Sequence, residues 1–517
     1  MKNTSKTKFI PTECENNMSF DDCELAILRQ AVDSNEKISG QKLASSDEIK
    51  KMIEIVENFL KTKKLLCYGG TAINNILPKH AQFYNKEYEI PDYDFYSDNA
   101  LVHAKELADI YYKEGYEQVE AKSGVHDGTY KVFVNFIPMA DITSLHKELF
   151  DSLSKECISV GGIKYVPPNF LRMGMYLELS RPAGDISRWE KVLKRLNLLN
   201  KHHPMKIQYD CEKVDFLRKM DETKNDSEKI YFIMRDTFID LGVVFFGGYA
   251  ASLYSRHMSK KDKQFIDKIP DFDVLAENPK ECSTIIVERL EDAGYKNVKI
   301  IEHDSIGEII PEHIEIRYKN EVLGFIYKPI ACHNYNVLNV QEKEINVGTI
   351  DTIMSFYLAF TYAKTDYYYV DRILCMSKYL FELEQRNRLS QRGLLKRFGP
   401  KCIGKQETME NIRAKKTTRF LELKKTKGSG EYEKYFLKYS PGDEEKPDTI
   451  DENEKTEKSV KEGSKKELKE KSVKEESKKE LKGKSIKEES KKEIKGKSSN
   501  KTAKKRRLSF RNLLRGF

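Results

Sequence analysis

Two aspartates, Asp92 and Asp94, lie in the apolar segment IPDYDFY at 90–96. On a β-strand the side chains of residues i and i+2 share one face, so we expect the two carboxylates side by side, with Tyr93 and Phe95 on the opposite face. Carboxylates this close repel each other unless a cation lies between them. Hard divalent cations such as Mg²⁺ prefer oxygen ligands from carboxylates and phosphates. The pair therefore predicts a divalent-metal site.

A third aspartate, Asp141, follows the alternating segment Thr129 to Ile137, which predicts a strand. If that strand lies beside the one with Asp92 and Asp94, Asp141 completes the cluster. Three carboxylates suit two metal ions, one that activates a 3′-hydroxyl and one that stabilises a leaving pyrophosphate. The three aspartates are therefore the predicted catalytic residues and metal ligands.

The turn Gly69-Gly70-Thr71 stands between a predicted strand, Leu65 to Tyr68, and a predicted helix, Thr71 to Leu77. Glycines let the backbone approach a triphosphate closely, and N–H groups at a helix start favour anions. Thr71 adds a hydroxyl group. The turn is a predicted nucleotide-binding site, and together with the aspartates it suits phosphoryl transfer.

Neither an Asp-x-Asp pair nor a Gly-Gly pair is specific by itself. Their order along the chain (strand, Gly-Gly, helix, Asp-x-Asp, strand-borne aspartate) resembles the polymerase-beta-like nucleotidyltransferase superfamily. Within it, the sequence resembles the poly(A) polymerase catalytic subunits of large cytoplasmic DNA viruses, the group of the poxviruses and the mimivirus-like viruses. This resemblance covers roughly residues 40–430 and rests on LLCYGGTAINN, IPDYDFYS, MADIT and YLELSRPAGDISRWEKVLKRLNLLN.

The resemblance implies a template-independent transfer of AMP from ATP to the 3′-hydroxyl of mRNA, with two Mg²⁺ or Mn²⁺ ions. The expected partners are ATP and an RNA 3′ end, and a homodimer or a stimulating subunit is compatible with the sequence. Two other functions stay open: a CCA-adding or uridylyl-adding enzyme, since the aspartates do not select the base, and an inactive RNA-binding scaffold. One departure from the superfamily is the gap of 22 residues between Gly70 and Asp92, which is longer than usual.

Four sequence blocks recur in the same order with a period near 180 residues. They are LLCYGGTAINN (65–75) and VVFFGGYAASL (243–253), IPDYDFY (90–96) and IPDFDVL (269–275), FVNFIPMADIT (133–143) and GFIYKPIACHN (324–334), and MYLELSRP (175–182) and SFYLAFTY (355–362). Four matches in one order predict a duplicated domain. Each copy is expected to be α+β, a mixed sheet with flanking helices.

The second copy is predicted to be degenerate. It keeps Gly247-Gly248 and Asp271-Phe-Asp273, but the block alignment places Cys332 where the first copy has Asp141. Two carboxylates bind a metal weakly, and Glu315 is the one candidate for a third ligand. We therefore expect an architectural or RNA-binding role for the second copy.

Two clusters of positive charge are candidate binding residues. Arg188 and Lys194, in the segment 181–199, are predicted to reach the triphosphate, although a solvated helix face explains them equally well. Residues 391–430 carry a net charge of +9, whereas residues 1–390 sum to −8. Beside a nucleotidyltransferase, such a basic segment predicts a contact with RNA, against the alternative of a solvated face.

The predicted organisation is an N-terminal extension (1–40), a catalytic domain (41–225), a degenerate copy (226–390), a basic RNA-binding segment (391–440) and a basic tail (441–517). The tail repeats a 13-residue Lys/Glu/Ser unit that is too polar to bury a core, which predicts disorder. The nine cysteines form no Cys-x-x-Cys pair or metal-ligand cluster. We therefore expect mostly small core thiols and a cytoplasmic protein, in the viral factory or the virion, without membrane spans.

Overall fold

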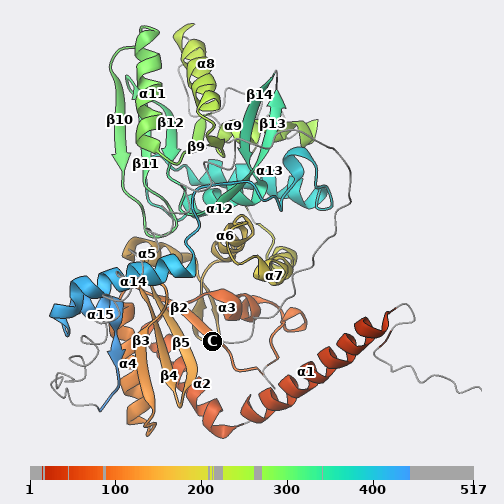
Figure 1. Ribbon diagram of the computed structural model, residues 1–517, viewed down its shortest axis with the longest axis vertical. Helices are drawn as coiled ribbons and strands as arrows, with labels where there is room; N and C mark the ends of the chain where they lie inside the picture. The colour runs from red at the N-terminus through yellow and green to blue at the C-terminus, as the bar shows by residue number, and fades with distance from the viewer. Residues whose placement is uncertain are drawn as a thin grey trace, which may run out of the picture. The chain divides into compact units, whose positions relative to one another are not determined.

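The apolar segments ahead of the two Gly-Gly turns form short buried strands, β1 (Leu66–Cys67) and β8 (Val244–Phe245), inside two sheets (Figure 1). The computed structural model describes residues 14, 18–44, 46–85, 89–205, 207, 210–211, 214, 225–260, 271–340 and 342–442. These residues belong to one compact unit. The predicted tail lies outside them from residue 443 onward, and the predicted domain boundaries stay predictions.

The first sheet has eight strands in the order β16-β3-β4-β5-β2-β1-β7-β6. Strand β2 runs parallel to β5 and antiparallel to β1, so the sheet is mixed. Its other strands are β2 (Tyr93–Ser97), β3 (Val119–Ser123), β4 (Thr129–Val134), β5 (Ile137–Ser144), β6 (Ile158–Val160), β7 (Ile163–Tyr165) and β16 (Lys438–Tyr439).

The second sheet repeats this arrangement in the order β10-β11-β12-β9-β8-β14-β13-β15. Without β16 and β15, the two sheets share the same strand order and the same parallel and antiparallel pairings. The predicted duplication and the α+β class are therefore confirmed. The remaining strands are β9 (Phe272–Leu275), β10 (Val298–His303), β11 (His313–Tyr318), β12 (Glu321–Tyr327), β13 (His333–Val340), β14 (Lys343–Gly348) and β15 (Cys402–Ile403).

One predicted strand was wrong. The segment from Thr129 to Ile137 is not a single strand, because the chain turns at Asn135 and Phe136, which have φ angles of 50° and 65°. Strands β4 and β5 are therefore the two arms of an antiparallel hairpin. No glycine marks this turn in the sequence, and glycine is the usual signal for positive φ angles in a hairpin.

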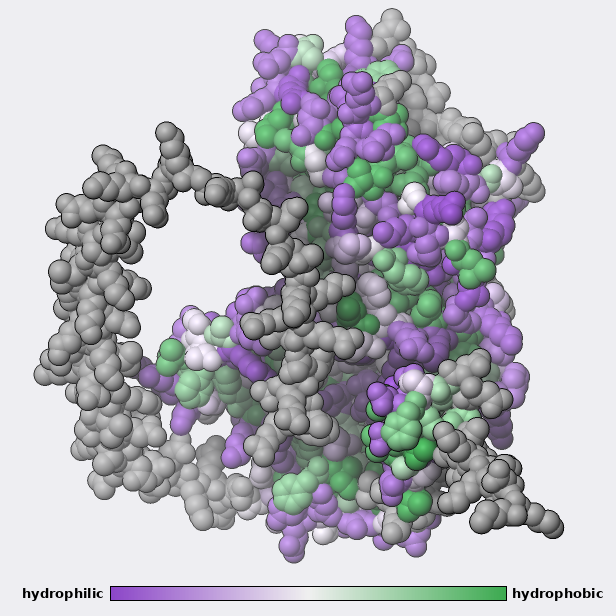
Figure 2. Space-filling model, turned by 45° about the vertical axis from the view of Figure 1, so that its right-hand side comes forward, coloured by the Kyte–Doolittle hydropathy of each residue, from purple (hydrophilic) through white to green (hydrophobic). Residues whose placement is uncertain are grey.

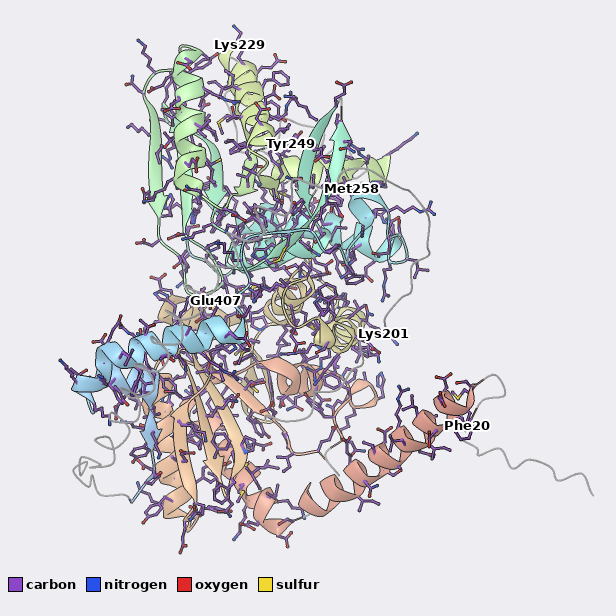
Figure 3. The ribbon with its side chains drawn as sticks, in the orientation of Figure 1. Phe20, Lys201, Lys229, Tyr249, Met258 and Glu407 are labelled. Carbon is purple, nitrogen blue, oxygen red and sulfur yellow. A yellow bond between two sulfur atoms is a disulfide. The ribbon has the colours of Figure 1, made fainter. Side chains whose placement is uncertain are left out.

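Amphipathic helices cover both sheets (Figures 1 and 3). Helix α4 spans Ala100–Lys113, and α2 (Asp47–Lys63) begins after Ser46. The other helices are α1 (Phe20–Ala44), α3 (Gly69–Ile76), α5 (Lys147–Glu156), α6 (Pro168–Leu179), α7 (Trp189–His202), α8 (Asn225–Asp240), α9 (Gly248–Tyr254), α11 (Pro279–Asp292), α12 (Ile350–Phe360), α13 (Val370–Arg386), α14 (Met409–Leu423) and α15 (Gly430–Phe436), with 3-10 turns at η1 (Lys79–Ala81), η2 (Ile186–Arg188), η3 (Ser255–His257), η4 (Gly393–Leu395) and η5 (Lys424–Thr426).

Helix α12 joins the two copies, because it packs against α6 of the first copy and α13 of the second. Every residue of α12 is buried. Among the described residues, no helix combines the length and apolar content needed to cross a bilayer. The face drawn in Figure 2 is instead mostly hydrophilic, with apolar residues interspersed.

The basic segment at 391–440 contributes a strand to each sheet. β15 pairs with β13 at one end of the second sheet, and β16 pairs with β3 at one end of the first. The N–H of Ser123 donates to the carbonyl of Leu437 (3.0 Å), and the N–H of Leu437 donates to the Ser123 hydroxyl (2.7 Å). This segment is therefore integrated into the folded body.

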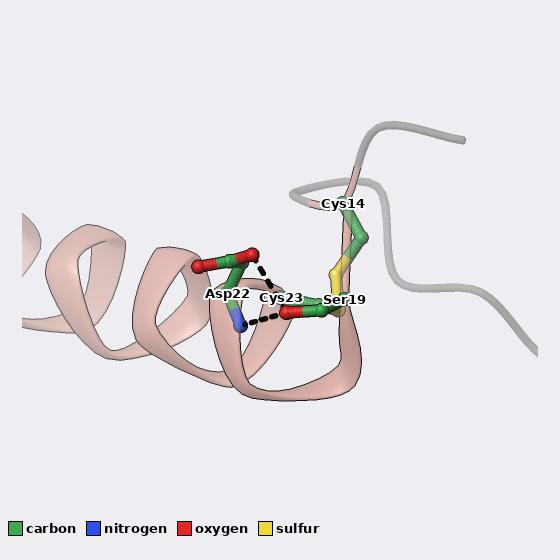
Figure 4. The surroundings of a disulfide bond; sticks show 4 residues. All are labelled: Cys14, Ser19, Asp22 and Cys23. Atoms are coloured by element: carbon green, nitrogen blue, oxygen red, sulfur yellow. Dashed lines mark hydrogen bonds between the residues drawn. A yellow bond between two sulfur atoms is a disulfide. The ribbon is translucent and has the colours of Figure 1, made fainter. Parts of the chain in front are cut away.

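The cysteine prediction was wrong for six of the nine residues. Disulfides join Cys14 to Cys23, Cys211 to Cys375 and Cys332 to Cys402. The first lies at the start of α1, where the Ser19 hydroxyl accepts the N–H of Asp22 (3.2 Å; Figure 4). The other two pairs join residues 164 and 70 positions apart, which sequence spacing does not reveal. The cytoplasmic location stays a prediction.

Candidate active site

Strands β2 and β5 bring the three predicted aspartates together. Asp94 on β2 pairs in register with Asp141 on the parallel strand β5, and residues paired in this way share one face of a sheet. Asp92 immediately precedes β2. Tyr93 and Phe95 are 1% and 0% exposed, so they anchor β2 from the opposite face, as the sequence predicts.

Burial and neighbouring negative charge disfavour the ionised forms of Asp92 and Asp94. Burial, followed by the charges of Asp92 and Asp141, raises the pKa of Asp94 to about 7. Burial and then the charge of Asp141 also raise the pKa of Asp92. Because a raised carboxyl pKa means that the fold penalises the negative charge, a cation at this position would be strongly attracted.

Lys131 supplies a positive charge beside the three aspartates. It lies on β4 in register with Asp141, and its ammonium group donates to the Asp141 carboxylate. In the part of the chain that the structure describes, no group of three or more His, Cys, Asp or Glu side chains is arranged to hold a metal ion as it stands. The sequence does not reveal Lys131, because a single strand running through Ile137 would not pair it with Asp141.

The Gly-Gly turn lies against the aspartates, at the start of α3. A Cβ atom on Gly69, which has a φ of 72°, would lie 2.4 Å from Asp94 Oδ2. A Cβ atom on Gly70 would lie 2.3 Å from the Tyr84 hydroxyl. The Thr71 hydroxyl donates to the backbone carbonyl of Asp92 (2.5 Å). Gly69 is therefore required by its positive φ and by the close approach of Asp94, a side chain on Gly70 would displace Tyr84 and Arg195, and Thr71 holds the backbone of Asp92.

Tyr84 and Arg195 form a second polar group beside Gly70 that sequence analysis misses. Arg195 Nη2 donates to the Tyr84 hydroxyl (2.8 Å), and the guanidinium lies 5.0 Å from the ring centroid of Phe83. Both Nη atoms of Arg195 would lie 3.0 Å from a Cβ on Gly70. The guanidinium is therefore held at the start of α3, where a helix attracts anions.

A cleft of about 1180 Å³ opens beside this group. Its walls come from the loop after α3, from α7, and from the C-terminal part of α13 with Arg388. Lys201, near the C-terminal end of α7, is labelled in Figure 3. The cations that line the cleft are Lys191, Lys194, Arg195, Lys201 and Arg388, against the acids Glu89 and Glu190. The cleft therefore suits an anionic ligand.

The two predicted phosphate-binding cations, Arg188 and Lys194, lie near this site but have other partners. Arg188 Nε lies 3.0 Å from Glu178 Oε1, yet its charge still lowers the pKa of Asp94. Lys194 lines the cleft and forms an ion pair with Glu190 (2.6 Å), and both side chains are largely exposed. Their role in nucleotide binding stays a prediction.

The structure corrects the alignment of the second copy. Asp273 pairs in register with Phe325, so Phe325 and not Cys332 is the counterpart of Asp141. Cys332 lies beyond the end of β12, in a disulfide with Cys402. The error arises because matching the two prolines, Pro138 and Pro329, shifts the alignment by seven residues, from Phe325 to Cys332.

Glu315, the candidate third ligand of the second copy, is the counterpart of Lys131, because it pairs with Phe325 on the neighbouring strand. Its carboxylate is 1% exposed and accepts from Arg317 Nε (2.5 Å). His303 Nε2 lies 2.9 Å from its other oxygen. Glu315 is thus bound to its own neighbours.

Comparisons with known proteins agree with this geometry. Residues 54–185 match the family model described as poly(A) polymerase catalytic subunit. A protein of African swine fever virus (isolate Tick/Malawi/Lil 20-1/1983), provisionally named poly(A) polymerase catalytic subunit, is 32% identical over 176 residues, which cover 33% of this chain and 37% of the relative. A protein of Acanthamoeba polyphaga mimivirus with the same provisional name is 26% identical over 346 residues, which cover 61% of this chain and 57% of the relative.

The solved structure of the Megavirus polyadenylate synthase superposes on this chain with a TM-score of 0.67 and 20% identity. The superposition covers 85% of this chain and 88% of the Megavirus chain, so the two share the duplicated fold. The sequence relatives match over less than two thirds of their own length. The resemblance seen in the sequence is confirmed as a similarity, which for the family model extends over residues 54–185.

Proposed function

We propose that this chain is a template-independent polynucleotide adenylyltransferase that transfers AMP from ATP to the 3′-hydroxyl of an RNA. The proposal rests on the placement of Asp92, Asp94 and Asp141 beside the Gly69-Gly70 turn, which also adjoins Arg195 of a cation-lined cleft. In this reaction the 3′-oxygen forms a bond to the α-phosphorus of ATP. The bond from the α-phosphorus to the bridging oxygen breaks, and pyrophosphate leaves with that oxygen.

The residues at this site fit Mg²⁺ or Mn²⁺. The donors are carboxylate oxygens, which hard cations prefer, and burial together with the charges of Asp92 and Asp141 raises the pKa of Asp94 to about 7. Asp92, Asp94 and Asp141 would hold the two ions, which supply charge neutralisation at the phosphates and activation of the attacking hydroxyl. Lys131 orients Asp141, and Thr71 fixes the backbone of Asp92.

The remaining residues bind and position the substrates. Backbone N–H groups at the start of α3 face the triphosphate, because the two glycines leave room for its close approach. Arg195 is held beside Gly70 by Tyr84 and Phe83, so its guanidinium is already oriented for phosphate oxygens. Arg188 and Lys194 add positive charge nearby.

The acceptor RNA contacts the basic segment 391–440 in this proposal. Helix α14 carries Arg413, Lys415 and Arg419, and Lys416 ties it to the first sheet through the carbonyl of Gly124 (2.5 Å). Arg397 takes no part, because its side chain is 6% exposed and paired with buried carboxylates. A second copy of the chain or a stimulating subunit as partner stays a prediction.

A primer-extension assay tests the proposed reaction. The full chain is incubated with a labelled RNA oligonucleotide and each nucleoside triphosphate in turn, with Mg²⁺ or Mn²⁺. We expect extension with ATP well above that with the other three. A preference for UTP or CTP would instead favour a uridylyl-adding or CCA-adding enzyme. If no nucleotide is incorporated, the chain is an RNA-binding scaffold and the proposal is wrong.

Replacing Arg195 by alanine should weaken ATP binding. A charged hydrogen bond to phosphate contributes about 1.5–3 kcal/mol, so the KM for ATP should rise about tenfold or more. The R195A variant also frees Tyr84 from its partner, so Tyr84→Phe separates the two effects. The measurement is the rate of AMP incorporation at varied ATP concentration.

Lys280→Ala is the matched control, since Lys280 is an exposed cation of the second copy that pairs only with Glu302 among its described contacts. It should leave the KM for ATP unchanged. An equal rise in KM for R195A and K280A would show that Arg195 acts only through net charge.

A further inference from the structure

One aspartate of the second copy, Asp271, binds an arginine of the same chain. Arg372 Nη2 donates to the carboxylate of Asp271, the counterpart of Asp92, and both side chains are buried, at 8% and 5% exposed. A Cβ atom on Gly248 would lie 2.1 Å from Asp271 Oδ1, and one on Gly247 would lie 2.3 Å from Asp273 Oδ2. The carboxylates therefore lie against the Gly-Gly turn, as Asp94 does in the first copy.

The space in front of these carboxylates is filled. The cavity beside Asp273 has a volume of about 20 Å³, and Tyr367, Tyr368 and Tyr369 line it together with Arg372. Such a space holds one or two water molecules at most. In the first copy, Tyr84 and Arg195, which adjoin Gly70, line a cleft of about 1180 Å³. The second copy therefore has no room for a nucleotide at this position.

Arg372 lies in the first turn of α13, and the other end of α13 forms a wall of the first copy's cleft. Phe381 and Gln385 of α13 line that cleft, as does Arg388 just beyond it. Arg388 Nη2 donates to Asn197 Oδ1 on α7 (2.7 Å), so the end of α13 contacts the opposite wall directly. A change in the position of α13 would therefore change the shape of the cleft.

We propose that Arg372 is a built-in cation of the second copy. Its guanidinium takes the place that a metal ion would occupy beside the Asp271 carboxylate. In doing so it anchors α13 and positions the wall of the first copy's cleft. Arg372 is a positioning residue in this proposal. The statement about the cleft rests on the proposed function, whereas the replacement of a metal by the guanidinium does not.

Thermal unfolding of the full chain tests whether the Arg372 guanidinium stands in for a metal ion. The background carries Asp92→Asn and Asp94→Asn, so that these two carboxylates of the first copy do not bind the added metal. In EDTA, Arg372→Met should lower the Tm by about 5 °C, because it removes the buried cation that pairs with Asp271. Adding MnCl₂ should restore part of this loss. Arg372→Lys should keep most of the wild-type Tm. When Asp271→Asn is combined with Arg372→Met, the Tm should rise with MnCl₂ no more than it does in the background protein that carries only Asp92→Asn and Asp94→Asn.

Two results would overturn the claim that the guanidinium takes the place of a metal ion. One is an unchanged Tm for R372M in EDTA, and the other is an equal response to MnCl₂ with and without Asp271. The cleft is tested separately with Asp92 and Asp94 intact: R372M should raise the KM for ATP severalfold more than it lowers kcat. An unchanged KM would refute the positioning role. If the wild type transfers no AMP, only the proposed function fails, since the Tm measurements do not depend on activity.

Discussion

Replacing Asp94 by asparagine should abolish nucleotide addition and make the chain more stable. Loss of a metal ligand removes several kcal/mol of transition-state stabilisation, so AMP incorporation should fall about a thousand-fold, or ~4 kcal/mol. The same change removes a charge that the fold penalises, as the pKa of about 7 for Asp94 indicates. Because solvent screens the half-buried site, we expect a stability gain of about 1 kcal/mol. Primer extension and urea denaturation measure the two effects.

The control for this variant is Asp98→Asn, just after the end of β2. Asp98 lies 3.7 Å from Lys147 and is partly exposed, so its replacement should change neither activity nor stability appreciably. The affinity for RNA should be nearly the same in the wild type, D94N and D98N. Activity of D94N above a tenth of the wild-type value would contradict the assignment of Asp94 as a metal ligand.

Replacing Arg397 by methionine should lower the free energy of unfolding more than any of the other substitutions proposed for this chain. Arg397 Nε and Nη2 hold Asp351 of α12 at 2.8 and 2.5 Å, and Nη1 lies 2.6 Å from Glu384 of α13. Both carboxylates are buried, at 0% and 3% exposed. Removing the shared guanidinium leaves two unpaired buried charges, which costs about 3–5 kcal/mol. Urea denaturation followed by circular dichroism measures this loss.

Arg419→Met provides the comparison, because Arg419 of α14 also pairs with two carboxylates, Glu422 (3.0 Å) and Glu431 (2.8 Å), but at an exposed position. Exposed pairs contribute about 0–1 kcal/mol, so R419M should be close to the wild type. Similar losses for R397M and R419M would show that burial does not set the strength of the Arg397 network.

The sequence predicted the aspartate cluster because its signals are local. An alternation of two residues fixes the face of Asp92 and Asp94, and glycines are required where the backbone nears Asp94. The duplication was also visible, since strand, turn and aspartates recur in order. These features depend on neighbours in the chain, and they are the ones that the structure reproduces.

The features that the sequence did not reveal depend on register and on contacts between distant segments. Lys131 and Phe325 are identified only once the strand pairing is known. Arg195 reaches Tyr84 across 111 positions, and Arg372 reaches Asp271 across 101. One arginine in a helix resembles any other until the fold shows which one faces a carboxylate or a glycine.

The pairing of β16 with β3 has a consequence for how the chain is made. Leu437 and Ser123, which tie these strands together, are 314 residues apart. At a synthesis rate of about 5–20 residues per second, the ribosome needs tens of seconds to deliver β16 after β3 has emerged. During that time the edge of β3 has no cover, and an uncovered edge strand readily pairs with another chain. A nascent or truncated product that ends before residue 438 is therefore exposed to aggregation through its catalytic half.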